Sequence, residues 1–113
     1  MPNKKNPLKL NPLQLKTLTL LQEIARQPSL SEPDAESGEV RIRALPHAHG
    51  NHFHLGDYVV SARDATGLSN PAVWAALARK GLVRDEPGAY AVTKDGIAYD
   101  TGLREEILHG ADH

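Results

Sequence analysis

The stretch Gly67-Leu-Ser-Asn-Pro-Ala-Val-Trp-Ala-Ala-Leu-Ala-Arg-Lys-Gly-Leu-Val83 carries the signals for a turn, a short helix and a stop. Either Ser69 or Asn70 can cap the helix, and Pro71 suits its first position. Gly81 suits its end, because glycine adopts the left-handed conformation at low cost. The stretch therefore predicts one short helix that is followed directly by a strand.

The remainder of the 113-residue chain is expected to supply elements on both sides of this stretch. In order, these are a flexible basic tail over residues 1–9, a helix over 12–26, a polar loop over 27–39, an alternating β-hairpin over 40–55, a short helix over 58–66, a strand–turn–strand unit over 84–93, a helical segment over 94–108 and a frayed end over 109–113. Asn11 and Gln14 can form a capping box on the first long helix. Gly102 is a point at which the last helical segment can break.

Two short motifs suggest how these elements are assembled. Gly-Leu-Ser before the helix and Leu-x-x-Lys-Gly-Leu-Val after it resemble the helix-turn-helix of winged-helix regulators, the MarR-like group among them. The resemblance covers about residues 57–100. It implies an α+β fold, in which residues 1–113 form a single winged-helix-like domain with an N-terminal helix and a β-hairpin inserted before the helix-turn-helix. Residues 58–66 would be the first helix of that motif, and residues 84–93 would be the wing.

The resemblance also implies where DNA would be bound. In winged-helix proteins the second helix enters the major groove and the wing contacts the DNA backbone or the minor groove. The candidates for contacts with DNA or a protein partner are Asn70, Trp74, Ala75, Arg79 and Lys80 on and after the helix, the wing turn 85–88, and Arg41 and Arg43 on the hairpin. We therefore expect a small regulatory or accessory protein with weak or dimer-dependent DNA binding.

The chemistry of this surface favours a second interpretation. The helix is mostly alanine and valine between Asn70 and Arg79, and such side chains read no base edges. Asp85 and Glu86 at the wing tip would repel phosphate, and the formal net charge is only −1. Trp74 could fill the core or an intersubunit contact, or could be exposed and stack on a base or a partner. The alternative is thus a protein-interaction module that has kept the fold and lost DNA reading.

The least ordinary feature is a cluster of histidines, His47, His49, His52 and His54, in the predicted hairpin. A turn at Gly50-Asn51 would place His49 opposite His52 and His47 opposite His54, all on one polar face. Neutral imidazoles are good ligands for zinc, copper or nickel, so a metal-binding hairpin is a further possibility. The other interpretations are a solvated polar face, a pH-sensitive element, and an anion-binding face that also uses Arg41, Arg43 and Tyr58.

Several functional classes find no support in the sequence. The chain has no cysteine and shows no nucleophile elbow, phosphate-binding loop or H-E-x-x-H motif, so we expect a non-enzymatic protein whose only possible cofactor is a divalent transition metal such as zinc. It shows no signal-peptide pattern and no apolar run long enough to cross a bilayer, so a cytoplasmic protein is expected. The broad apolar faces of residues 12–26 and 94–108 make a homodimer plausible.

Overall fold

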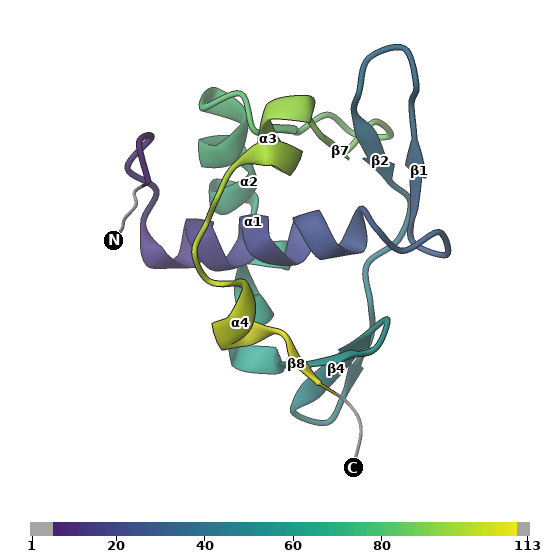
Figure 1. Ribbon diagram of the computed structural model, residues 1–113, viewed down its shortest axis with the longest axis vertical. Helices are drawn as coiled ribbons and strands as arrows, with labels where there is room; N and C mark the ends of the chain where they lie inside the picture. The colour runs from purple at the N-terminus through teal and green to yellow at the C-terminus, as the bar shows by residue number, and fades with distance from the viewer. Residues whose placement is uncertain (1–5, 111–113) are drawn as a thin grey trace.

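The computed structural model describes residues 6–110 and shows a mixed α+β fold with two small antiparallel sheets. Helix α1 (Pro12–Ile24) crosses the middle of the molecule, with one sheet beyond each side of it (Figure 1). The predicted capping box is confirmed: Asn11 accepts a hydrogen bond from the Gln14 amide at 2.8 Å, and the Gln14 side chain accepts one from the Asn11 amide at 3.0 Å. Local signals therefore set the start of this helix.

The first sheet has the strand order β1-β2-β7-β6 and contains β1 (Ser31–Pro33), β2 (Val40–Ile42), β6 (Val83–Arg84) and β7 (Ala91–Val92). The expected strand–turn–strand unit over 84–93 is present as β6, a turn and β7, and Gly88 has a φ of 77° in that turn. The interpretation of residues 27–39 as a loop alone was wrong, because they include β1. That strand pairs with β2 through Ser31↔Ile42 and Pro33↔Val40, and no local sequence pattern predicts this pairing.

The second sheet has the order β3-β4-β5-β8 and contains β3 (Ala48–His49), β4 (His52–Leu55), β5 (Tyr58–Ser61) and β8 (His109–Gly110). The predicted hairpin over 40–55 was therefore only partly right. The alternating run is split between the two sheets, and residues 43–47, which include Pro46, belong to no helix or strand. Proline has no amide hydrogen to donate to a sheet, which agrees with the break at this point.

The helix predicted over residues 58–66 was wrong for residues 58–61, while residues 62–66 are helical. Tyr58–Ser61 is a strand that pairs with β4 along its whole length, as β-branched Val59 and Val60 favour. A 3₁₀ helix, η1 (Ala62–Ser69), follows it, so Gly67 lies inside a helix and does not form a turn before α2. Asn70 alone separates η1 from α2 (Pro71–Arg79).

The last helical segment breaks as its glycine allows. Helix α3 (Lys94–Ala98) and helix α4 (Arg104–Ile107) are separated by a stretch in which Gly102 has a φ of 73°. The prediction of a frayed end was wrong for His109–Gly110, which form β8 against β5; the rest of that end, residues 111–113, lies outside the described residues.

The expected flexible tail was also wrong for the part that is described. Residues 1–5 lie outside the described residues, but Asn6 is held in place by its side chain. Its Oδ1 accepts hydrogen bonds from the Leu10 amide at 2.9 Å and from the Tyr99 hydroxyl at 2.6 Å. The Leu8 amide donates to the same Tyr99 oxygen at 3.1 Å. Hydrogen bonds to Tyr99 therefore connect the segment before α1 to the end of α3.

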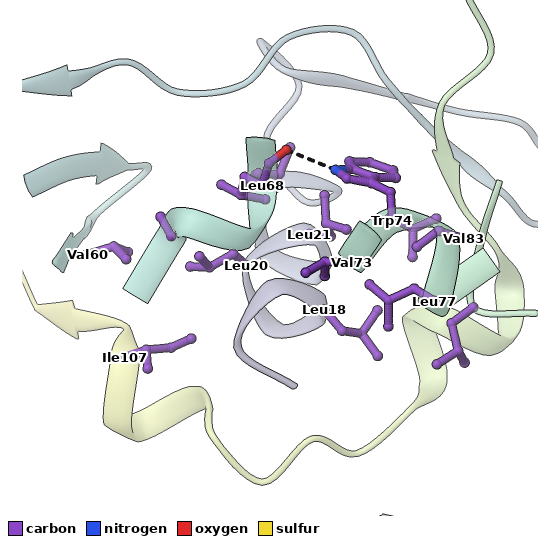
Figure 2. Packing of buried hydrophobic residues seen from close by; sticks show 14 of the residues in the cluster. Leu18, Leu20, Leu21, Val60, Leu68, Val73, Trp74, Leu77, Val83 and Ile107 are labelled. Atoms are coloured by element: carbon purple, nitrogen blue, oxygen red, sulfur yellow. Dashed lines mark hydrogen bonds between the residues drawn. The ribbon is translucent and has the colours of Figure 1, made fainter. Parts of the chain in front are cut away.

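The core surrounds α1 on several sides (Figure 2). Leu18, Leu20, Leu21 and Ile24 are at most 1% exposed, and they pack with buried residues from η1, α2, both sheets and α4. The apolar face of α1 is thus used inside one chain, which removes part of the reason for expecting a dimer. None of the helices in the described part of the chain is both long and apolar enough to span a membrane.

Candidate functional site

Trp74 of α2 lies in the core and not on an open helix surface. Its side chain is 7% exposed, and its indole Nε1 donates a hydrogen bond to the Leu68 carbonyl at 2.9 Å (Figure 2). Its ring meets Tyr90 edge to face, with centroids 5.3 Å apart. The hypothesis of an exposed Trp74 that stacks on a base is therefore wrong, because the indole is already packed and hydrogen-bonded.

Trp74 also lines a hollow on the described surface. We call this hollow the Trp74 groove; it has a volume of about 320 Å³ and is lined by Ile42, Arg43, Ala44, Leu45, Leu68, Ser69, Pro71, Trp74, Asp85 and Tyr90. Most of its lining is apolar, and Tyr90 is 38% exposed. Arg43 and Asp85 add one cation and one carboxylate, and neither makes an ion pair with another residue in the range 6–110. The groove can thus accept an apolar group and one or two charges beside it.

The other predicted contact residues of α2 differ in their exposure and their hydrogen bonds. The Asn70 side chain accepts a hydrogen bond from the Ala72 amide at 3.0 Å, so it caps the helix. Ala75 is half-buried. Arg79 and Lys80 are exposed after the apolar stretch, and the Lys80 Nζ donates to the Leu8 carbonyl at 2.9 Å. Arg79 and Lys80 are therefore the exposed donors at the end of α2.

The charges near the wing are largely compensated. Arg84 Nη2 lies 2.6 Å from Glu39 Oε2, and Arg84 Nη1 lies 3.9 Å from Glu86 Oε2. Hydrogen bonding to Glu39 and attraction to both carboxylates raise the pKa of Arg84. Arg41 is exposed and pairs in register with Glu32 on the neighbouring strand β1. This region is therefore a mixture of paired charges and not a continuous basic face.

The histidines of the second sheet lie close together as the sequence predicts. His49 and His52 are opposite each other in the ladder, and the ring centroids of His49, His52 and His54 lie between 4.9 and 6.2 Å apart. His47 is exposed and precedes the first paired residue of β3, so its expected pairing with His54 is not formed. Within residues 6–110 no group of three or more His, Asp or Glu side chains is arranged to hold a metal ion. The four-histidine metal site is therefore not assembled.

The sheet adds a histidine that sequence reasoning missed. His109 of β8 lies opposite Val59, which in turn lies opposite His54, so it shares the outer face of the sheet with His49, His52 and His54. Arg41 and Arg43 lie in or after a strand of the other sheet, and Tyr58 lies on the opposite face from these histidines. The anion-binding face that was to combine these residues is therefore not formed.

The sequence analysis also missed an ion pair between the buried Glu23 of α1 and Arg104 of α4. Glu23 is 4% exposed, and its Oε1 forms an ion pair with Arg104 Nη2 at 2.6 Å. Arg104 also lies over the Tyr58 ring, 5.5 Å from its centroid. Burial opposes the charge of Arg104, but hydrogen bonding to Glu23 and Tyr58 outweighs it and raises the pKa of Arg104. A glutamate on an apolar helix face was the one available signal.

Comparison with known proteins does not extend this description. No protein family, curated protein or solved structure matches the chain.

Proposed function

We propose that this chain is a small, non-enzymatic, winged-helix-like accessory protein that binds a polypeptide segment of a partner in the Trp74 groove. The element order α1, β2, η1, α2, β6, β7, together with the neighbours β2-β7-β6 in the first sheet, supports a winged-helix-like assignment. In such an arrangement the groove lies between the wing and the helix that would otherwise enter DNA.

The observation that carries the proposal is the groove itself. Its apolar walls and exposed Tyr90 leave hydrophobic surface in water, which burial against a partner would make favourable. Its volume of about 320 Å³ exceeds that of a single large side chain. Arg43 at the groove has no carboxylate partner within residues 6–110. We therefore assign as occupant a segment with a large apolar side chain next to an aspartate or glutamate.

Residues 43–47 favour a polypeptide over a small molecule. This segment borders the groove through Arg43, Ala44 and Leu45 and belongs to no helix or strand. The Arg43 and Ala44 amides already donate to the Leu30 carbonyl, so an added strand would have to use the remaining backbone groups of the segment. An extended peptide beside it could bind through main-chain hydrogen bonds while its apolar side chain enters the groove. A small amphipathic carboxylate would use only the pocket.

Weak DNA binding is the second candidate function, because exposed Arg79 and the element order both favour it. Other features favour the partner-binding proposal instead. Asn70 is used as a helix cap, Trp74 is buried, and the turn between β6 and β7 is acidic. Arg84, the basic residue within β6, already has two carboxylate neighbours.

The chain contains one tryptophan, so its fluorescence reports directly on the groove. Peptides selected from a random display library against the full chain should shift Trp74 emission on binding, and the selected set should share an apolar residue beside a carboxylate. Ala44→Leu should fill the groove and weaken these peptides at least tenfold. Ala72→Leu is the matched control, since Ala72 is exposed on α2 and does not line the groove.

Two results would overturn the proposal. One is selected peptides that bind both leucine variants equally well, since they would not use the groove. The other is a Trp74 response to small apolar carboxylates with no response to peptides, which would assign the groove to a metabolite. Sedimentation of the free chain completes the test, because self-association that Ala44→Leu abolishes would identify the occupant as a second copy.

A further inference from the structure

Two histidines on the outer face of the second sheet hold their side-chain nitrogens at a short distance. His52 and His54 are two residues apart on β4, so they project to the same side of the strand. Their Nε2 atoms lie 3.2 Å apart, and their ring planes are inclined at 81°. His52 is half-buried and His54 is exposed, so the pair is open to solvent on one side.

We propose that His52 and His54 chelate one divalent transition metal ion through their Nε2 atoms, with water completing the coordination. A zinc–nitrogen bond of about 2.0–2.1 Å and a tetrahedral angle place two ligating nitrogens roughly 3.3 Å apart. The observed Nε2–Nε2 distance of 3.2 Å agrees with that separation. In the metal-free chain the same distance accommodates a hydrogen bond, in which one neutral ring donates and the other accepts. Metal binding would replace that hydrogen bond without moving the strand.

The surroundings define the metal class and the strength of binding. Imidazole nitrogen without thiolate or carboxylate suits Cu²⁺, Ni²⁺ and Zn²⁺ and does not suit Mg²⁺ or Ca²⁺. The His49 ring lies farther away, with its centroid 5.4 Å from that of His54 and 6.2 Å from that of His52, so it stands beside the pair as a neighbour. Two protein ligands on a surface strand give a weaker site than three or four. We therefore expect a reversible, micromolar-class site and no dependence of folding on metal.

The test uses the untagged full-length chain and the metal ions alone. Isothermal titration with Zn²⁺ and with Cu²⁺ should give saturable binding of one ion per chain, and the electron paramagnetic resonance spectrum of bound Cu²⁺ should show coupling to two nitrogens. His52→Ala and His54→Ala should each weaken binding at least tenfold while the circular dichroism spectrum stays unchanged. His47→Ala is the matched control, because His47 belongs to the same segment but lies outside the ladder, and it should bind normally.

Absence of saturable binding would overturn the proposal. Equal weakening by all three substitutions would do so as well, since it would indicate diffuse affinity of a histidine-rich segment. If a variant loses its fold, the conservative His52→Gln and His54→Gln substitutions provide the same comparison, because glutamine keeps a polar side chain of similar length and is a poor ligand for these ions. The result is independent of the Trp74 groove, which lies against the other sheet.

Discussion

At the scale of single residues, Glu23 stands out because its carboxylate is buried and depends on its partners for stabilisation. Its carboxylate is buried, with Arg104 at 2.6 Å and the Gln27 Nε2 donating to Oε2 at 2.9 Å. Glu23→Ala would remove the acceptor of the Gln27 amide and the carboxylate partner of Arg104. Arg104 keeps 38% of its side chain exposed and can turn toward water, which limits the loss. We expect the free energy of unfolding in urea to fall by about 2 kcal/mol.

A second glutamate provides the control for burial. Glu39 receives two hydrogen bonds from Arg84, at 2.6 and 3.2 Å, but this pair lies at the surface. Glu39→Ala should therefore destabilise the chain less than Glu23→Ala does, since exposed ion pairs contribute little. Equal losses for the two variants would show that burial of Glu23 does not decide the strength of its contacts.

The predictions from the sequence were most accurate where they depended on single residues at helix ends. Asn11 and Asn70 cap helices in the structure as their local patterns predict, and Gly81 has the positive φ, 78°, expected at a helix end. These features depend on neighbours within four residues. The burial of Glu23 depends on Arg104, which lies far along the chain, so no local pattern could have identified it.

At the scale of elements, the errors fall where a strand finds its partner from a distant part of the chain. Residues 58–61 were expected to be helical, yet they form the strand between β4 and β8. Strand β1 and strand β8 were missed for the same reason, since each is at most three residues long and exists through its ladder. Because β8 was missed, His109 was absent from the candidate histidines. Short strands of this kind are specified by tertiary contacts more than by propensity.

The contact between α1 and η1 gives a prediction at this scale. Gly67 in η1 packs so closely on Thr17 of α1 that an added Cβ would overlap the Thr17 Oγ1 atom. Gly67→Ala should therefore destabilise the chain by about 1–3 kcal/mol, as overpacking does. Thr17→Ala removes the overlapping oxygen, and only a Cβ contact of 3.1 Å and a Leu13 contact of 3.4 Å remain. The double variant should recover about 1 kcal/mol relative to the sum of the single losses.

Gly96 supplies the matched comparison. An added Cβ there would overlap the backbone carbonyl oxygen of Leu82, which no side-chain truncation removes. Gly96→Ala should lose stability to a similar or greater degree, and Thr17→Ala should not restore it. Thermal unfolding of the five variants measures these differences. If the double variant lost as much stability as Gly67→Ala and Thr17→Ala together, the contact between η1 and α1 would not be fixed, because the two helices would have moved apart.

At the scale of the whole molecule, function depends on how charge is distributed over the fold. The formal net charge is −1, and in the first sheet Arg84 lies beside the carboxylates of Glu39 and Glu86. Helices α1 and α2 and the strand–turn–strand unit after α2 could be anticipated from their helix and turn signals. The ion pair between Arg84 of β6 and Glu39, the residue before β2, joins positions 45 residues apart, and it could not be anticipated. The positions of the charged residues relative to one another were therefore known only from the structure.

The acidic wing tip allows the two candidate functions to be separated. Glu86 is exposed beside Arg84, with 61% of its side chain in solvent. Glu86→Lys changes the formal net charge from −1 to +1 and places a cation where a winged-helix wing would meet phosphate. If the wing faces DNA, this variant should bind random duplex several-fold more tightly at low salt. Its log–log salt dependence should steepen by about 0.9 for one added phosphate contact.

The control must change the charge equally at another place. Glu105→Lys does so, because Glu105 is an exposed residue of α4, in the part of the chain that packs near the second sheet (Figure 1). Fluorescence anisotropy with a labelled random duplex across salt concentrations compares both variants with the parent. Tighter binding by Glu86→Lys alone would favour the DNA orientation. A similar gain in both variants would reflect net charge, and no gain in either would leave the wing and the adjacent Trp74 groove to a partner polypeptide, as their paired charges and apolar walls favour.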